Sequence, residues 1–156
     1  MTKKRKWLDT GFVPHRLEMK LSLAWIAKPV PLWRILDRLE TEHMRHGGMS
    51  NGELFVSYKQ FIQAGVSKRR ISQMLELGER LGFLEIVRPK DAWRGDVKAP
   101  NSYRLTYLPT KNNPIPTDEW KKIQSIEQAE KIVEQFSEKK KQLEKREERA
   151  CLAKAS

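Results

Sequence analysis

The stretch Gly65–Leu75, GVSKRRISQML, places three consecutive basic residues at the start of a predicted helix. Ser67 is the expected N-cap, and apolar residues follow it at helical spacing. The free N–H groups and the dipole of a helix already make its first turn positive, so a cationic cluster there is unfavourable on its own. Either the cluster is incidental, as a solvated helix start, or it faces an anion.

The residues around that cluster predict a helix-turn-helix. Ser57 is followed three residues later by Gln60, which matches a capping box and opens a short first helix that ends at Gly65. The second helix is expected to run from Ser67 until Gly82 closes it. Its predicted buried face consists of Ile71, Met74, Leu75, Gly78 and Leu81.

Three positions carry the features that this motif requires. An apolar side chain on the first helix has to face the second, a glycine has to permit a left-handed turn, and a branched apolar side chain has to anchor the second helix. Phe61, Gly65 and Ile71 supply them at the required spacing.

Three further elements are expected before the motif. The run RLEMKLSLAW, residues 16–25, alternates apolar and polar residues, which favours a strand. A helix is then expected from Pro31 to about His46, because its apolar residues recur at helical spacing and Gly47 follows at its end. The residues of that apolar face are Leu32, Ile35, Leu36 and Leu39. The run GELFVS, residues 52–57, fits a short strand.

Two runs after the motif predict a hairpin. FLEIVRP and NSYRLTYLP read as strands, and a polar, basic loop of about a dozen residues joins them. The resulting order is helix, strand, helix, turn, helix, strand, loop and strand. That order predicts an α+β fold, a winged helix-turn-helix with a three-helix core and a small antiparallel sheet, over residues 12–108.

The rest of the chain is expected to extend this domain. Residues 1–11 form a basic N-terminal arm, residues 109–116 a linker rich in Pro and Asn, and residues 117–156 a charged helical tail. Apolar residues are sparse in the tail, and Glu130 and Lys140 interrupt its coiled-coil pattern. We therefore expect a solvated helix there, with self-association left open.

The charge of the chain predicts a polyanionic partner. Its formal net charge is +11, and residues 1–116 hold 21 Lys and Arg against 11 Asp and Glu. Because the excess lies where the folding signals lie, nucleic acid is the expected partner, with an anionic membrane surface as the other physical option. No segment approaches the roughly 18 apolar residues of a membrane span. The single cysteine, Cys151, favours a reducing cytoplasm over a disulfide-bonded fold.

The helix that starts near Ser67 offers candidate DNA-binding residues. Arg69, Ser72 and Gln73 lie on or beside the face opposite its apolar side, and such side chains hydrogen-bond to base edges in the major groove. Glu76 shares that face and repels phosphate unless it accepts a hydrogen bond from cytosine N4. Phosphate or wing contacts are expected from Lys68, Arg70, Arg80, Lys90, Arg94 and Lys98. Lys3–Lys6 in the arm could follow a groove in the same way, and could equally form a flexible solubilising end.

Signals for an enzyme or a metal site are weak. Glu42, His43 and His46 lie within about one helical turn, but they do not match HExxH and have no third ligand elsewhere. No phosphate-binding glycine loop, nucleophile elbow or paired-carboxylate motif is evident. The sequence thus predicts neither enzymatic activity nor a metal, cofactor or small-molecule ligand.

Three runs in the chain resemble a known group of proteins. LETEHMRHGGMSNGELFVSYKQFIQAGVSKRRI, LGFLEI and PNSYRLTYLPT are similar to small winged-helix proteins of alphaproteobacterial chromosomes, plasmids and integrated elements. The similarity covers residues 17–108 and is most distinctive in HGG-x-x-NG-x-L and the closing RLTY. It implies a winged-helix DNA-binding domain, most often assigned to transcriptional regulation. Members often have less basic residues where this chain has Lys68–Arg70, which suggests that sequence preference varies within the group.

The leading hypothesis is a sequence-specific regulator of transcription that binds double-stranded DNA and is associated with the nucleoid. A second hypothesis is a plasmid or mobile-element replication or accessory protein whose winged helix mediates assembly with a larger protein. The chain is also similar to winged-helix modules of plasmid replication initiators. RNA binding through the same basic surface is a third. A homodimer is left open, and it would predict two half-sites about one helical turn apart.

Overall fold

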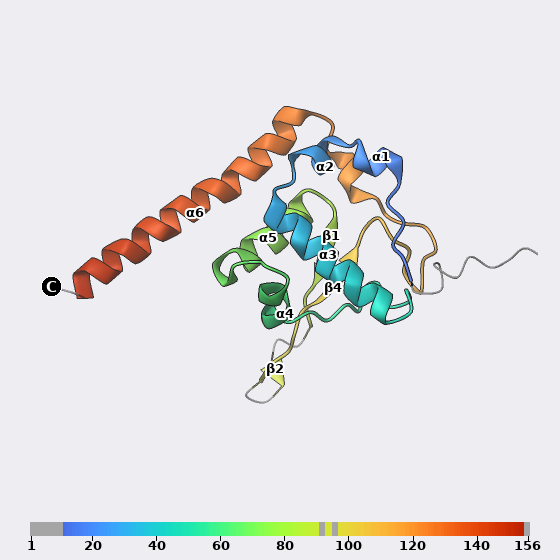
Figure 1. Ribbon diagram of the computed structural model, residues 1–156, viewed down its shortest axis with the longest axis horizontal. Coiled ribbons are helices and arrows are strands. Elements are labelled where there is room, and N and C mark those ends of the chain that lie inside the picture. The colour runs from blue at the N-terminus through green and yellow to red at the C-terminus, as the bar shows by residue number, and fades with distance from the viewer. Residues whose placement is uncertain (1–10, 91–92, 95–96, 155–156) are drawn as a thin grey trace, which may run out of the picture.

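The computed structural model describes residues 11–90, 93–94 and 97–154, and it confirms the predicted α+β class. Helices α3, α4 and α5 surround an apolar core, and a pair of antiparallel strands closes one side of it (Figure 1). The long helix α6 leaves the body of the fold and carries the C-terminus away from it. Within the described ranges, no helix has both the length and the apolar character that crossing a membrane requires.

Helix α3, Val30–Arg45, confirms the predicted helix in this part of the chain. Its first turn contains Pro31, where the missing N–H leaves no hydrogen bond unmade. The four residues of the predicted apolar face are at most 2% exposed. Beyond the helix, Gly47 and Gly48 have φ of +69° and +72°, so they end it in a left-handed conformation that glycine adopts without strain.

The strand predicted over residues 16–25 is wrong, because two short helices occupy this segment. Helix α1 spans Leu17–Lys20 and helix α2 spans Leu23–Ala27. Between them the Ser22 hydroxyl accepts a hydrogen bond from the Trp25 N–H at 3.2 Å and caps α2. The alternation was misleading because two of its apolar side chains, Leu17 and Leu21, are exposed.

The strand predicted over residues 52–57 is reduced to one bridge. Leu54 and Tyr103 exchange two backbone hydrogen bonds, with N···O distances of 3.3 and 2.9 Å. Hydrogen bonds from the Asn51 side chain take the place of further strand pairing. This buried side chain donates to Leu105 O at 2.9 Å and accepts from Leu105 N at 2.7 Å. A side chain thus does here what a backbone ladder would do in a longer strand.

Helices α4, Tyr58–Gln63, and α5, Lys68–Arg80, confirm the predicted helix pair. The capping box of Ser57 and Gln60 is present, and Gly65 turns the chain with φ of +88°. Ser67 occupies the N-cap position of α5, although its hydroxyl makes no capping hydrogen bond. Phe61 on α4 is buried. The five residues predicted to form the apolar face of the second helix, from Ile71 to the C-cap residue Leu81, are buried as well.

The predicted hairpin is confirmed and is longer than a single strand pair. Strand β1, Leu84–Val87, pairs antiparallel with β4, Ser102–Leu105, with Leu84 opposite Leu105. Strands β2, Trp93–Arg94, and β3, Val97–Lys98, form a second short ladder farther along the same hairpin. The hairpin therefore projects beyond the core, as Figure 1 shows below α4.

The tail is helical as expected, but its first half is not solvated. The 3-10 helix η2, Glu119–Lys122, places Trp120 in the core with 3% exposure. Helix α6, Ile126–Lys154, then buries Ala129 and Phe136 against the fold. Apolar residues at sparse positions suffice for this packing because they lie on one side of the helix. The expectation of a solvated helix is correct only for the part of α6 after Phe136, where the described side chains are exposed.

Candidate nucleic-acid interface

The close packing of α5 against the core fixes which of its sides faces outward. A Cβ on Gly78 would lie 2.7 Å from a methyl group of Leu84 and 2.9 Å from one of Leu32, so α5 lies unusually close to β1 and α3. The opposite side of α5 therefore points away from the core. Its exposed residues are Lys68, Arg69, Ser72, Glu76 and Arg80.

The three predicted base-reading residues differ in exposure. Arg69, whose side chain is 78% exposed, and Ser72 both lie on the outer surface of α5. Gln73 is half-buried and presents less of its amide. The structure therefore brings Arg69 and Ser72 together at the start of α5, with Gln73 beside them and closer to the core.

The predicted phosphate-binding residues of α5 also differ. Lys68 and Arg80 are exposed at opposite ends of the helix. Arg70 is half-buried, and its Nε atom is buried without a hydrogen-bond partner. The side chain of Arg70 thus lies partly against the fold, whereas Lys68 and Arg80 are available to an anion.

Two of the side chains predicted to contact phosphates, Lys90 and Lys98, are exposed on the hairpin. Arg94 pairs with Val97 through its backbone in the β2–β3 ladder, and the placement of its side chain lies outside the described part. The cations Lys3–Lys6 of the predicted arm lie outside the described residues. Of the predicted wing cations, Lys90 and Lys98 are therefore the ones that the described surface presents.

Two polar side chains that the sequence analysis missed hold these elements in place. Glu79 at the end of α5 accepts a hydrogen bond from Ile86 N at 3.0 Å and lies 3.5 Å from the guanidinium of Arg88. This fastens the base of the hairpin to α5. Arg34 on α3 donates to the carbonyl of Gly65 at 2.6 Å and holds the turn between α4 and α5.

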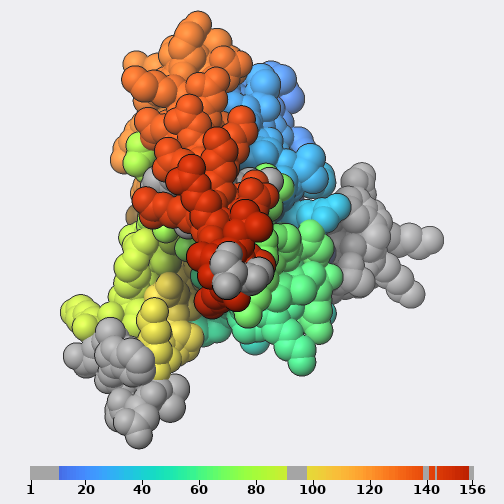
Figure 2. Space-filling view, turned by 90° about the vertical axis from the view of Figure 1, so that its left-hand side faces the viewer, coloured from blue at the N-terminus to red at the C-terminus, as the bar shows by residue number. Residues whose placement is uncertain are grey.

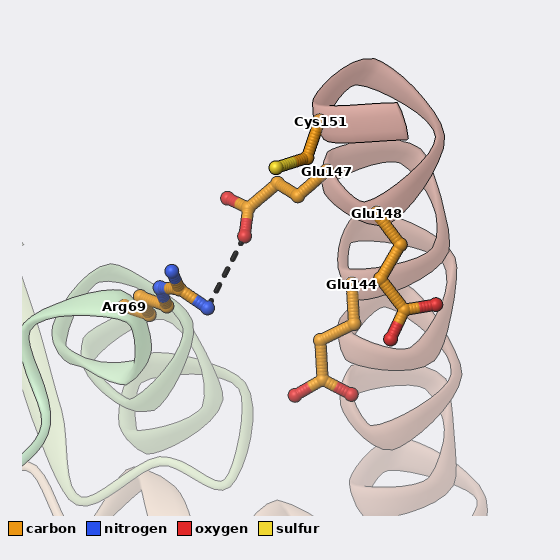
Figure 3. Close-up of a pocket in the computed structure, with 5 residues that line it drawn as sticks. All are labelled: Arg69, Glu144, Glu147, Glu148 and Cys151. Carbon is orange, nitrogen blue, oxygen red and sulfur yellow. Dashed lines mark ion pairs between the residues drawn. The ribbon is translucent and has the colours of Figure 1, made fainter. Parts of the chain in front are cut away.

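An acidic side of α6 lies next to the start of α5. Arg69 Nη1 is 3.2 Å from Glu147 Oε2, and the two side chains meet across an open cleft of about 380 Å³ (Figure 3). Glu144, Glu148 and Cys151 also line this cleft. This contact was not predicted, although the sequence carries one signal for it: Glu147 follows Ala129, Val133 and Phe136 at helical spacing on the same side of α6.

The acidic and histidine side chains near the end of α3 form a local network. Glu42 accepts from Arg38 at 2.7 Å and lies 3.0 Å from His46. Burial raises the pKa of Glu42, but the hydrogen bonds and charges of Arg38 and His46 outweigh it and lower the pKa. Burial lowers the pKa of His43, which favours its neutral form. Across the described residues, no group of three or more His, Cys, Asp or Glu side chains is arranged to hold a metal ion.

The described surface thus combines three features: the outward-facing start of α5, the hairpin with its exposed lysines, and the acidic side of α6, which approaches the start of α5. Comparison of the chain with models of protein families, with curated proteins and with solved structures finds no match.

Proposed function

We propose that this protein is a winged-helix protein that binds double-stranded DNA and reads its sequence with α5, acting as a regulator of transcription. The element order supports this proposal: α3, α4 and α5 around one core, followed by an antiparallel hairpin. In a helix-turn-helix the second helix enters the major groove, and here that helix is α5. The adjacent hairpin is the wing.

The orientation of α5 is the observation that carries the proposal. Its apolar side is fixed to the core by Ile71, Leu75 and Gly78, so its first turn presents Lys68, Arg69 and Ser72 outward. A major groove about 12 Å wide accepts one helix of this kind. Arginine donates to O6 and N7 of guanine, and serine hydrogen-bonds to any base, so the surface has donors that suit base edges.

The wing supports the same surface. Lys90 and Lys98 are exposed on a hairpin whose base is joined to α5 through Glu79. Contacts from such lysines to phosphates would set the register of α5 on the duplex without reading sequence themselves. Glu76, exposed on the outer side of α5, favours a cytosine in the site, because a carboxylate accepts a hydrogen bond from cytosine N4.

A competition experiment tests the polyanion class. Purified full-length protein is titrated with labelled duplex from the DNA upstream of its own coding sequence, with random duplex and with structured RNA of equal length, over a salt series. We expect one upstream duplex to be bound more tightly than random duplex, and both more tightly than RNA. Preference for RNA, or no binding to any of the three, would refute the proposal.

A further inference from the structure

We propose that the distal part of α6 competes with nucleic acid for the start of α5, so that the tail lowers the affinity of the protein for DNA. This inference rests on the proposed function, because it needs α5 to bind a polyanion. Its central contact is the ion pair between Arg69 and Glu147. Figure 2 shows the C-terminal half of α6 in front of the surface that contains α4 and α5.

The side of α6 that faces the fold changes its chemistry along the helix. Its first half carries the buried Ala129 and Phe136 and the partly buried Val133. At the same helical spacing, the distal half carries Glu147 and Cys151. The apolar part anchors the helix, and the acidic part then reaches the basic first turn of α5. An acidic group is also what the positive end of the α5 dipole favours.

The acidic side of distal α6 would occupy the space that DNA needs. A helix with its side chains is about 10–12 Å across, so a major groove about 12 Å wide that accepts α5 has no room for a second helix beside it. Glu144, Glu147 and Glu148 line the cleft next to Arg69, where they would also repel phosphates. Distal α6 and DNA therefore cannot occupy the start of α5 together.

The contact is built so that it can be displaced. Arg69 and Glu147 are 78% and 58% exposed, so water and salt screen their attraction. The described side chains of distal α6 are exposed, unlike Ala129 and Phe136 in the first half. Because α6 is one continuous helix, Ile126–Lys154, displacement requires its distal turns to bend away or unwind, while the core packing of the first half can remain intact.

Two triple variants test the inference by duplex binding. Glu144→Gln, Glu147→Gln and Glu148→Gln remove the acidic side that lines the cleft. The matched control, Glu127→Gln, Glu130→Gln and Glu134→Gln, removes the same charge from exposed positions of the same helix that do not line it. At about 0.1 M salt we expect the cleft variant to bind duplex roughly tenfold more tightly than the control, since each exposed ionic contact changes affinity by a few-fold at most.

The outcomes separate this inference from the proposed function. If all three proteins bind duplex and the two variants bind equally, the competition is refuted while the DNA-binding proposal stands. If none of the three proteins binds duplex, the proposed function fails and this inference fails with it. If the cleft variant binds and the wild type and control do not, both proposals are supported.

A measurement without DNA tests the contact itself. Cys151 is the single cysteine of the chain and is exposed, so a nitroxide can be attached to it without further substitution. In the wild type we expect the nitroxide to broaden the backbone amide signals of Lys68–Ser72. The cleft variant and added duplex should each remove this broadening. Broadening that persists when duplex is fully bound would overturn the inference.

Discussion

Gly82 lies directly against the backbone of Trp120: a Cβ on Gly82 would lie 2.4 Å from the Trp120 nitrogen. Thr106 completes this junction, since its hydroxyl donates to Gly82 O at 2.5 Å and its carbonyl accepts from Asp118 N at 3.0 Å. The end of α5, the end of β4 and the segment before α6 therefore meet at one point. This junction sets where α6 starts relative to α5.

Gly82→Ala should destabilise the protein strongly. The added Cβ would collide with backbone atoms, which cannot move aside as a flexible side chain can, and φ at this position is +81°. We expect a loss of about 3 kcal/mol or more in the free energy of unfolding, measured by urea denaturation. Gly47→Ala is the control, because φ there is +69° but nothing lies within 4 Å of the added Cβ. Equal losses in the two variants would contradict the role given to the Gly82 contact.

Asn51→Asp should also destabilise the fold, through lost hydrogen bonds. The Asn51 Nδ2 atom lies 2.9, 3.0 and 3.1 Å from the carbonyl oxygens of Leu105, Leu108 and Pro109. A carboxylate would turn this donor into a charged acceptor that faces three acceptors. We expect a loss of about 3 kcal/mol at pH 7, and a smaller loss at pH 4, where a protonated Asp donates again.

The control for this substitution is Asn113→Asp. Asn113 is exposed, and its side chain accepts one local hydrogen bond from Ile115 N at 3.0 Å. An acceptor at this position survives the change to Asp, so stability should change little. A large loss at Asn113, or none at Asn51, would show that the buried amide does not hold the loop to β4.

The stability of the protein should fall in acid, in part through Asp118. Burial raises the pKa of Asp118, but hydrogen bonds from Arg16 and Trp120 and the charges of Arg16 and Lys121 outweigh it and lower the pKa. A carboxyl group whose pKa is lower in the folded state stabilises that state above its unfolded pKa, near 4, and loses this contribution as pH falls through the folded value.

Asp118→Asn isolates this contribution. Asp118 has a left-handed backbone with φ of +50°, which Asn tolerates, so the substitution removes the charge without adding backbone strain. We expect the variant to be less stable at pH 7 and to lose less stability than the wild type between pH 5 and pH 2 in urea titrations. An acid dependence identical to that of the wild type would contradict the assignment.

The helices and hairpin could be predicted because their signals are local. The capping box of Ser57, the apolar spacing of α3 and α5, and the alternation in β4 each depend on neighbouring residues. The segment 16–25 was misread because two of its four alternating apolar side chains are exposed. The sequence places Glu147 on the same side of α6 as Phe136, but it does not show that Glu147 meets Arg69, since that contact depends on Trp120 and Phe136 bringing α6 alongside α5.

Lys90→Ala and Lys98→Ala together should weaken DNA binding without changing which sequence is preferred. Both side chains are exposed on the proposed wing, where phosphate contacts are expected. Loss of two such contacts should reduce the slope of log K against log salt by about 2. Lys111→Ala, an exposed lysine in the linker, should leave the slope unchanged. A slope unchanged in the double variant would exclude the hairpin from the interface.

The measurement that tests the central claim most directly is the ratio of affinities for a preferred duplex and a random duplex, compared between wild type and Arg69→Ala. Arg69→Ala also removes the ion pair with Glu147 and so releases α6, but this release changes the affinities for preferred and random duplex alike and cancels in their ratio. Arg45→Ala, an exposed arginine at the end of α3, controls for the lost charge. We predict that Arg69→Ala lowers the ratio by about 10-fold or more, as expected for a bidentate contact to guanine, and retains salt-dependent background binding. A ratio equal to that of the wild type would contradict base reading by α5.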